Sequence, residues 1–388
     1  MRSQQQEESH HMQSHPARRS LFALAGITAA LAMGVAGCGS DDDSGGSSSG
    51  SGSSKSGGKA DKVAVLLPDT KSSVRWETAD RPLLEAAFKS AGVPVTISNA
   101  QGDKSAQQQQ AEQAVTNGAK VLLLTNLDSG SGAAIQANAK SQGVKVIDYD
   151  RLTLKGQSDY YVSFDNVAVG KLQGEGLVNC LEAKGVSNPR VAVLNGSPTD
   201  NNATLFKQGY DSVLNPKFES GDFVEVADQS VPDWDNQRAL TIFEQMLQKA
   251  DNKVDGVLAA NDGLGNAAIS ALKQRKLPQI PVTGQDATAE GIQNILAGDQ
   301  CMTVYKAIKK EADAAAKLAI ALAKNEEPPA GLVNGKSDDG NREVPSVLLE
   351  PTAVTKDNIK DTVIADDFLK REDICSGKAA KACEEAGI

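Results

Sequence analysis

Short apolar runs alternate with longer amphipathic segments from Lys62 onward, and this alternation constrains the fold more than any other feature of the sequence. Runs rich in Val, Ile and Leu that are separated by helices are typical of buried parallel strands in βαβ units. The pattern predicts an α/β fold. The expected strands are residues 63–67, 93–97, 121–124, 144–147, 160–164, 191–194, 223–226, 254–259, 280–283 and 302–305. The expected helices are residues 78–91, 106–117, 132–142, 166–183, 237–250, 265–275 and 311–324.

Polar residues follow many of these expected strands, as Asp69, Asp150, Asn261 and Asp286 illustrate. In open parallel sheets, ligands bind outside the carboxyl ends of the strands, where helix amino termini also present backbone N–H groups. The strands fall into two consecutive series, so we expect two sheets with one polar rim each. Two rims that face each other would form a cleft.

The length and the composition exclude several classes of function. A chain of 388 residues suggests two domains, since a domain commonly has roughly 100–200 residues. All three histidines, His10, His11 and His15, precede the alternating segment. Histidine-based catalysis, histidine-ligated zinc and a histidine pH switch are therefore excluded from the body of the protein. The formal net charge of -10 also argues against nucleic-acid binding, which requires a basic face.

The amino-terminal region has the features of an export signal. An apolar stretch at residues 21–36 follows a pair of arginines and ends in the sequence VAGC, whose cysteine is Cys38. This ending resembles the lipobox of bacterial lipoproteins. We predict that residues 1–37 are a lipoprotein signal peptide, that Cys38 is acylated, and that residues 38–60, rich in Gly, Ser and Asp, are a tether. The protein would then be exported and lipid-anchored to the outer face of the cytoplasmic membrane.

The cysteine count agrees with export. Apart from Cys38, the sequence contains four cysteines, and an even number in an oxidising compartment predicts two disulfides. Four cysteines allow three pairings. The preferred pairing joins Cys375 with Cys383, which closes a short loop at the carboxyl terminus, and Cys180 with Cys301.

Motifs for catalysis, metals or cofactors are weak. The sequence GLGNAA that begins at Gly263 matches part of a dinucleotide fingerprint, but Asn261 and Asp262 separate it from the preceding strand. We interpret it as a loop-to-helix turn. The alternating carboxylates at Asp233 and Asp235 lack the glycine turn and the distal glutamate of a calcium loop. We therefore expect no catalytic residue, no metal site and no cofactor.

The chain has only two tryptophans, Trp76 and Trp234, and both lie in polar, loop-like surroundings. A tryptophan that served only the core would be expected inside an apolar run. Because one tryptophan lies in each half of the chain, the two are candidates for a pair of stacking surfaces on either side of a ligand.

Several ordered motifs share their spacing with a known family. The motifs are RW at 75–76, YDR at 149–151, SFDN at 163–166, GSPTDNNA at 196–203, ND at 261–262, GQD at 284–286 and MTVYK at 302–306. Together they resemble the substrate-binding proteins of sugar ABC transporters, which have the type I periplasmic binding protein fold. The likeness extends from about Lys62 to Phe368 and is strongest to members that bind D-xylose.

The resemblance implies an architecture. It implies two Rossmann-like lobes with parallel sheets, joined by a three-segment hinge and closing around a sugar. Residues 62–164 and 306–335 would form the N-terminal lobe, and residues 166–304 and 345–370 would form the C-terminal lobe. Residues 371–388 would remain as a disulfide-containing tail.

The resemblance also implies the ligand-binding residues. It places a pyranose ring between Trp76 and Trp234. The sugar hydroxyls would bond to Arg75, Asp150, Arg151, Asp200, Asn202, Asn261, Asp286 and Lys306. General chemistry agrees with this set, because the C–H faces of a pyranose suit aromatic rings and charged side chains form strong hydrogen bonds to hydroxyls.

We predict a monomeric binding protein, not an enzyme, that captures D-xylose and delivers it to an ABC permease with its ATPase subunit. Its partners would be the monosaccharide, the permease and, through the lipid anchor, the membrane, but no nucleic acid. One alternative is a binder of ribose, arabinose, galactose or glucose. Another is an extracellular carbohydrate-active enzyme, which would need a carboxylate pair across the cleft, such as Asp150 with Asp200 or Asp286. A transcription repressor of this fold would begin with a DNA-binding segment, which the sequence lacks.

Overall fold

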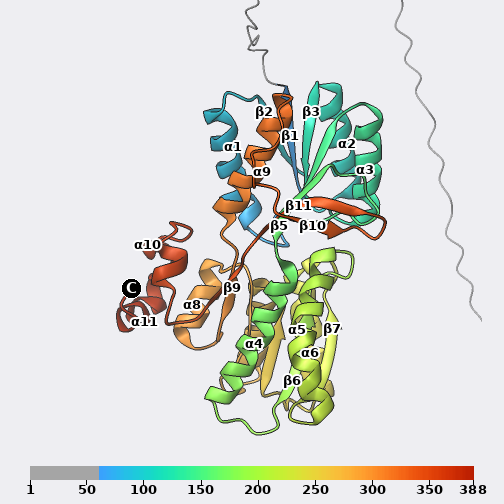
Figure 1. Cartoon of the computed structure of the whole chain (residues 1–388). Coiled ribbons are helices and arrows are strands. Elements are labelled where there is room, and N and C mark those ends of the chain that lie inside the picture. The colour runs from blue at the N-terminus through green and yellow to red at the C-terminus, as the bar shows by residue number, and fades with distance from the viewer. Residues whose placement is uncertain (1–60) are drawn as a thin grey trace, which may run out of the picture. The chain divides into compact units, whose positions relative to one another are not determined.

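The computed structural model describes residues 61–388, which form two α/β lobes with mostly parallel sheets (Figure 1). The predicted fold class is confirmed. The expected signal peptide, Cys38 and the tether lie outside the described residues.

The first lobe is built on a seven-stranded sheet in the order β10-β11-β5-β4-β3-β1-β2. All neighbouring strands are parallel except β10 and β11. The strands are β1 (Lys62–Leu67), β2 (Val95–Asn99), β3 (Ala119–Leu124), β4 (Lys145–Tyr149), β5 (Tyr160–Phe164), β10 (Gly335–Asp338) and β11 (Glu343–Leu349). The helices of this lobe are η1 (Trp76–Asp80), α1 (Arg81–Ser90), α2 (Lys104–Thr116), α3 (Ser129–Ser141) and α9 (Ile308–Ala323).

Two cores cover the two faces of this sheet. Successive side chains of a strand point to opposite faces. Val63 and Val65 of β1 accordingly join a core with α1 and α9, whereas Ala64 and Leu66 join a core with α2 and α3. A strand that is buried on both faces requires a continuous apolar run, which explains why the strands were recognisable in the sequence.

The second lobe contains a three-stranded parallel sheet in the order β7-β6-β8 and an antiparallel pair of β9 with β12. The strands are β6 (Arg190–Asn195), β7 (Val224–Ser230), β8 (Gly256–Ala259), β9 (Thr303–Tyr305) and β12 (Thr352–Val354). The helices are α4 (Asn166–Ala183), α5 (Asn201–Ser220), η2 (Pro232–Trp234), α6 (Asn236–Lys249), α7 (Asp262–Gln274) and α8 (Ala289–Ala297). The expected strand at 280–283 is reduced to a single bridge between Val282 and Val257.

Helices α5 and α8 were not predicted from the sequence. Helix α5 packs closely on α4, and the closest approach occurs where Gly170 faces Gly209 across the two helices. A Cβ atom at Gly170 would meet the backbone of Phe206, and one at Gly209 would meet the backbone of Val167. The interior Gly209 and Pro216 of α5 have poor helix propensity, so this helix depends on its packing against α4.

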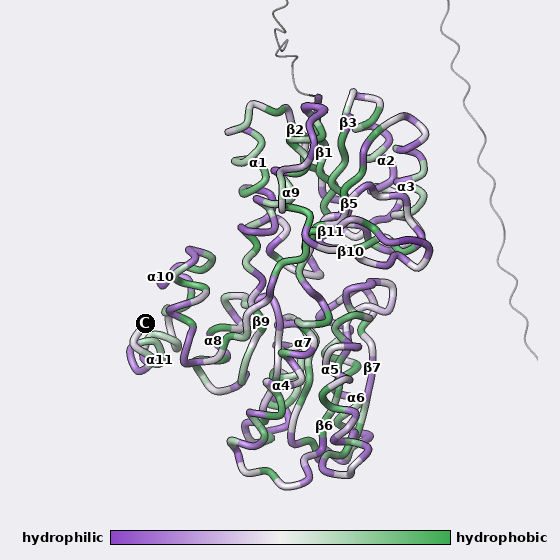
Figure 2. The backbone as a smooth tube through the Cα atoms, in the orientation of Figure 1, coloured by the Kyte–Doolittle hydropathy of each residue, from purple (hydrophilic) through white to green (hydrophobic). Residues whose placement is uncertain are grey.

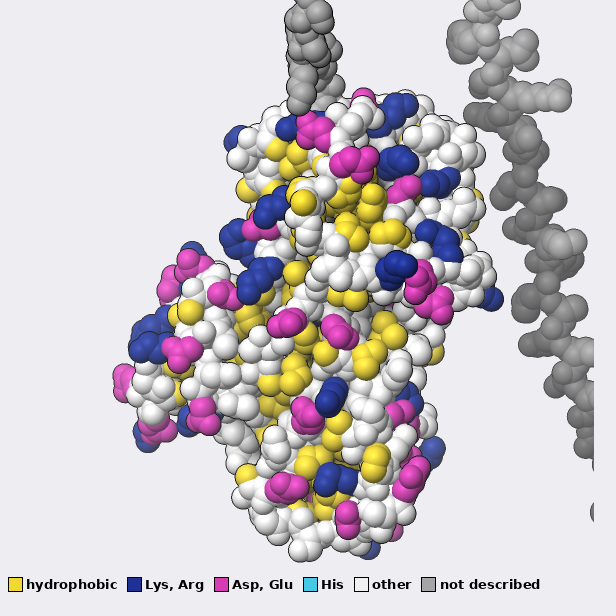
Figure 3. Space-filling view, in the orientation of Figure 1, with side chains coloured by type: hydrophobic (Ala, Val, Ile, Leu, Met, Phe, Trp, Pro, Cys, Tyr) yellow, Lys and Arg dark blue, Asp and Glu magenta, His cyan; other side chains and the backbone are white. Residues whose placement is uncertain are grey.

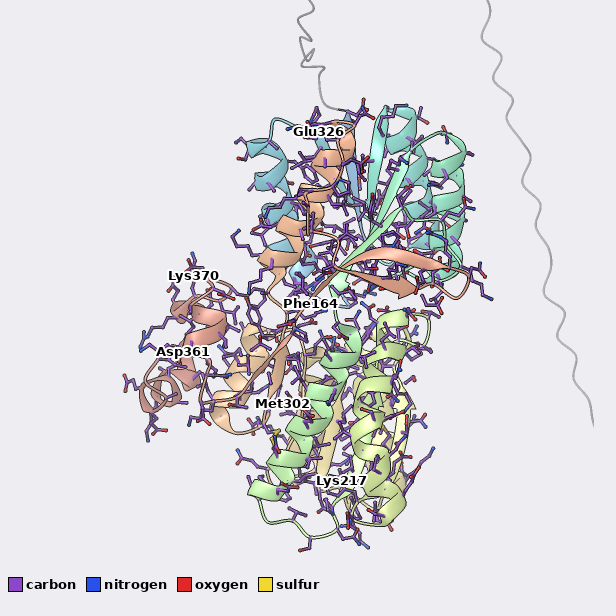
Figure 4. All side chains as sticks on the ribbon, in the orientation of Figure 1. Phe164, Lys217, Met302, Glu326, Asp361 and Lys370 are labelled. Atoms are coloured by element: carbon purple, nitrogen blue, oxygen red, sulfur yellow. A yellow bond between two sulfur atoms is a disulfide. The ribbon has the colours of Figure 1, made fainter. Side chains whose placement is uncertain are left out.

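The chain passes between the lobes three times, after β5 at Asp165, after β9 at residues 305–307, and after β11 at residues 350–351. The last crossing corrects the expected boundary, because residues 345–349 belong to the first lobe and not to the second. Strand β11 pairs with β5 in parallel, with Val347 opposite Val162. The apolar end of β11 is thus buried in the first sheet before the chain crosses. Phe164 ends β5 at the first crossing (Figure 4).

The carboxyl-terminal residues form a small additional unit against α8. It comprises η3 (Lys360–Ile364), α10 (Arg371–Ile374), η4 (Gly377–Ala379) and α11 (Ala380–Glu385). Its core contains Ile374 and Cys383, packed with Ile292 and Leu296 of α8. A disulfide joins Cys375 to Cys383.

The structure contains the preferred disulfide pairing. Cys375 and Cys383 have Cα atoms 5.7 Å apart, and Cys180 is bonded to Cys301 with Cα atoms 6.4 Å apart. The second bond ties α4 to the segment that leads into β9, so it links two elements of the second lobe that continue into hinge crossings.

The face of the described part drawn in Figure 3 carries charged side chains of both signs and scattered hydrophobic ones. Apolar residues concentrate along β1, β3 and β6 (Figure 2). On the face shown in Figure 3, basic and acidic side chains are interspersed. Among residues 61–388, no helix combines the length and the apolar character needed to cross a membrane.

Candidate ligand-binding site

A cavity lies between the two lobes, lined by residues from both. All ten residues expected to bind a ligand line it, namely Arg75, Trp76, Asp150, Arg151, Asp200, Asn202, Trp234, Asn261, Asp286 and Lys306. Four further residues, which the sequence analysis missed, complete the lining: Ser72, Ser73, Phe206 and Gln285.

Many of the lining residues follow strands or begin helices. Asp150 and Arg151 come directly after β4, and Lys306 comes directly after β9. Asp200 and Asn261 are the N-cap residues of α5 and α7, and the Asn261 side chain accepts a hydrogen bond from the Leu264 N–H at 2.9 Å. The site is therefore built at strand carboxyl ends and helix amino termini, the usual position for ligands in parallel sheets.

Three lining residues have left-handed backbone conformations: Asp150 with φ 64°, Trp234 with φ 55° and Asp286 with φ 97°. Such conformations cost of order 1–3 kcal/mol for residues other than glycine. The surrounding structure must hold these backbones in place, and strain of this kind concentrates at functional sites.

A buried network of charges surrounds Asp150. Its carboxylate lies 2.8 Å from the Arg75 guanidinium and 3.4 Å from the Lys306 ammonium. Burial alone would raise the pKa of Asp150, but Arg75, Lys306 and Arg151 together lower it well below its ordinary value. Asp150 is therefore an ionised, acceptor-only group at neutral pH.

Arg75 lies among three carboxylates. Besides Asp150, it contacts Asp80 at 3.4 Å and Glu311 of α9 at 3.4 Å. Burial lowers the pKa of Arg75, but these three carboxylates raise it further, so that the net value lies well above the ordinary one. Burial raises the pKa of Asp80 to about 6, against the opposing effects of Arg75 and of a hydrogen bond from Tyr149. Burial and the charge of Asp150 raise the pKa of Glu311 well above its usual range.

One nitrogen of Arg75 is left without a protein partner. The Nη1 atom is buried and has no hydrogen-bond partner among residues 61–388. The Arg75 side chain is only 5% exposed, and it lines the cavity. A buried donor without a partner costs about 1–3 kcal/mol, more when it is charged. Arg75 thus presents a ready donor to a polar ligand.

The two tryptophans have different surroundings. The Trp76 ring lies 4.1 Å from the guanidinium carbon of Arg75, and its indole N–H donates to the Ser72 hydroxyl at 3.2 Å. The Trp234 indole N–H donates to Asp200 at 3.0 Å, and the ring lies edge-on to Phe206 at 6.3 Å. Each indole is therefore held at its nitrogen by a residue of its own lobe.

Gly196 makes room for the Trp234 ring. A Cβ atom at Gly196 would overlap carbon atoms of the indole. Trp234 thus depends on a glycine in the loop after β6, a position inside one of the motifs that carried the family resemblance.

Ser72 is the most connected of the residues that the sequence analysis missed. Its hydroxyl accepts hydrogen bonds from Trp76 and, at 3.2 Å, from Arg151, while its carbonyl accepts from Asn261 of the second lobe at 3.5 Å. Nothing in a run of serines after β1 identifies such a position. Phe206 could have been found, since it lies one helical turn after Asn202, but α5 had not been recognised.

The described residues offer no metal site. No group of three or more His, Cys, Asp or Glu side chains within residues 61–388 is arranged to hold a metal ion. The glycines of GLGNAA fall within α7, and Gly265 approaches the backbone oxygen of Thr283. They are used for helix packing.

A polar cavity enclosed by two α/β lobes defines a bilobal ligand-binding protein, and comparison with known proteins identifies the family. A family profile described as periplasmic binding protein domain matches residues 63–327. The chain is 38% identical over 314 residues to the D-xylose-binding periplasmic protein of Escherichia coli, covering 81% of this chain and 92% of that protein. It is 33% identical over 335 residues to the multiple sugar-binding periplasmic receptor ChvE of Rhizobium radiobacter, covering 81% and 93%.

A solved structure agrees. An ABC transporter solute-binding protein from Clostridium phytofermentans with bound β-D-glucose matches with a TM-score of 0.75 and 31% identity, covering 81% of this chain and 99% of that one. The chain belongs to the periplasmic binding protein family.

Proposed function

We propose that this protein is the sugar-binding component of an ABC transporter and that its ligand is D-xylose. The observation that carries the proposal is the composition of the cavity between the lobes. It combines an arginine with an unpartnered buried Nη1, the ionised Asp150 and the indoles of Trp76 and Trp234. Donors, acceptors and flat apolar surfaces are together what a pyranose requires.

The same polar set accounts for selectivity. A site that bonds each hydroxyl rejects an analogue lacking one of them, because a buried partner would be left unsatisfied. D-Xylose is favoured among sugars by the 38% identity to a protein named for that ligand. The related structure with β-D-glucose makes a hexose the principal alternative.

The charges around Asp150 agree with a protein that binds and releases a sugar without a chemical reaction. A glycosidase needs one carboxylic acid with a raised pKa to protonate the leaving group. Asp150 has a lowered pKa and is paired with Arg75 and Lys306, so it is unsuited to that task. We propose a binding protein and no enzyme.

The remaining proposals concern location and partners. Residues 1–37 act as a lipoprotein signal peptide, Cys38 carries the lipid, and residues 38–60 tether the lobes to the outer face of the cytoplasmic membrane. The protein works as a monomer and delivers its sugar to a permease with an ATPase subunit.

The experiment is a calorimetric panel of D-xylose, D-ribose, L-arabinose, D-galactose and D-glucose on the purified protein. We expect saturable, one-to-one binding that is tightest for D-xylose, with the sugar recovered unchanged. Tighter binding of a hexose would replace D-xylose as the ligand. Absence of binding to every monosaccharide, or turnover of a glycoside, would overturn the proposal.

A further inference from the structure

The backbone carbonyl of Asp150 is a point of contact between the lobes. It accepts hydrogen bonds from the Tyr161 hydroxyl at 3.0 Å, the Ser163 hydroxyl at 3.0 Å and the Asn202 carboxamide at 2.9 Å. Tyr161 and Ser163 belong to β5 of the first lobe, whereas Asn202 belongs to α5 of the second. Asp150 has a left-handed backbone, so the three donors also stabilise a strained residue.

The Asn202 carboxamide reaches across the cleft in one orientation. Its Nδ2 atom donates to the Asp150 carbonyl and also to the Asp150 carboxylate at 3.1 Å. Its Oδ1 atom accepts a hydrogen bond from Asn166 at 3.0 Å and lies 3.4 Å from the Tyr161 hydroxyl. Because Asn166 donates to the oxygen, the nitrogen faces Asp150, while the single Tyr161 O–H proton goes to the nearer Asp150 carbonyl.

Asn166 occupies the first hinge crossing. It is the first residue of α4 and directly follows Asp165, where the chain leaves the first lobe. Its amide also donates to the Tyr161 hydroxyl at 3.2 Å. The orientation of Asn202 is thus coupled to the crossing by hydrogen bonds among fully or nearly fully buried side chains.

Tyr161 and Asn166 do not line the cavity that contains Arg75 and Trp234. They line a separate pocket on the hinge side, together with Phe164 and Leu348. Any effect of Tyr161 or Asn166 on a ligand in the first cavity must therefore pass through Asn202 and Asp150.

We propose that Tyr161 and Asn166 are positioning residues that set the balance between open and closed lobes, Tyr161 by holding the Asp150 carbonyl and Asn166 by aiming Asn202 at it. The contact is made by protein groups alone, so it favours the closed lobes independently of a ligand. A bond to an ionised carboxylate is stronger than one between neutral groups, and Asp150 supplies both that carboxylate and the carbonyl. The affinity of a ligand that requires the closed state scales with the populated fraction of that state.

Loss of the Tyr161 or Asn166 hydrogen bonds should lower the closed fraction whether or not a ligand is bound. Every ligand that requires the closed state should then bind more weakly. The affinity readout rests on the proposed sugar-binding function, whereas the shape of the empty protein does not.

The test uses Tyr161→Phe and Asn166→Ala in the full chain. Radius of gyration is measured by small-angle X-ray scattering without ligand, and calorimetry gives the affinities for D-xylose and for a second sugar of the panel. Tyr210→Phe is the matched control, because the Tyr210 hydroxyl donates to Asn195 wholly within the second lobe. Melting temperatures monitor folding of all three variants.

We expect Tyr161→Phe and Asn166→Ala each to enlarge the ligand-free radius of gyration and to weaken the binding of both sugars, by about fivefold for a hydrogen bond of ordinary strength. Tyr210→Phe should lower the melting temperature without either effect. An unchanged radius of gyration in both variants, or unchanged affinities for both sugars, would overturn the inference. If the parent protein binds no sugar, the proposed function fails, and the scattering comparison alone decides the inference.

Discussion

The Arg75 guanidinium lies 2.8 Å from the Asp150 carboxylate, and this pair joins the loop after β1 to the end of β4 inside the first lobe. Glu311, 236 positions along the chain from Arg75, lies 3.4 Å from the same guanidinium nitrogen. The arginine is thus oriented by residues far apart in sequence before any ligand arrives. Such preorganisation lowers the entropic cost of ordering side chains when a ligand binds.

Replacement of Arg75 by lysine should weaken sugar binding by roughly 10- to 100-fold, since the variant keeps the charge but loses the planar fork and the contact with Trp76. Calorimetry with D-xylose measures the loss. Arg81→Lys is the control, because Arg81 pairs with Glu77 outside the cavity. Equal effects of the two substitutions would contradict the role of Arg75.

Trp234→Ala should reduce affinity far more than its effect on folding explains. Trp234 and Phe243 are both buried in the core of the second lobe, and loss of a buried aromatic side chain costs about 3–5 kcal/mol of stability. Phe243→Ala therefore serves as a control of similar stability cost. Urea denaturation and sugar titration of both variants should show similar destabilisation but a loss of affinity only for Trp234→Ala. Comparable affinity losses would reduce Trp234 to a packing residue.

The two disulfides should differ in their contribution to stability. The bond between Cys180 and Cys301 spans 121 positions and that between Cys375 and Cys383 spans 8. Loop-closure entropy assigns about 5 kcal/mol to the long loop and about 2.5 kcal/mol to the short one. Paired Cys→Ala substitutions, followed by thermal unfolding, should lower the melting temperature more for the first pair. The reverse order would show that strain or residual structure outweighs loop length.

Asp262 should make the stability of the second lobe depend on pH. Burial raises the pKa of Asp262 to about 7, despite hydrogen bonds from Gln300, Thr288 and Thr303. A raised carboxyl pKa contributes stability that is complete below the unfolded value of about 3.9 and is lost as the pH rises through 7.

As the pH rises from 5 to 8, ionisation of Asp262 should therefore lower the unfolding free energy by on the order of 2 kcal/mol. Guanidinium denaturation at both pH values should show a smaller decrease in unfolding free energy for Asp262→Asn than for the parent protein. Asp103→Asn, at the exposed cap of α2, is the control and should leave the decrease unchanged. A decrease of equal size in Asp262→Asn and the parent would contradict the assignment.

Strands β1 to β9 and most helices were predictable because their signals are local, whereas β10, β11 and β12 were not predicted. An apolar run such as residues 121–124 is buried on both faces of the sheet. Its short length and unbroken apolar character identify it as a strand without knowledge of its neighbours. Helix α4 begins and ends at the predicted residues 166 and 183. Helix α5 was missed because Gly209 and Pro216 weaken its local signal, and its close contact with α4 compensates for them.

The sequence by itself determined the α/β class and, through the family resemblance, the ten residues that line the cavity between the lobes. Only the tertiary structure decided that β11 completes the first sheet, that Ser72 links Trp76 to Arg151, and that Asn202 is aimed at Asp150 by Asn166. The physical reason is the distance along the chain over which each interaction acts. Periodicity and capping act within a few residues of the chain, whereas strand partners, backbone strain and the direction of a carboxamide depend on groups that only folding brings together.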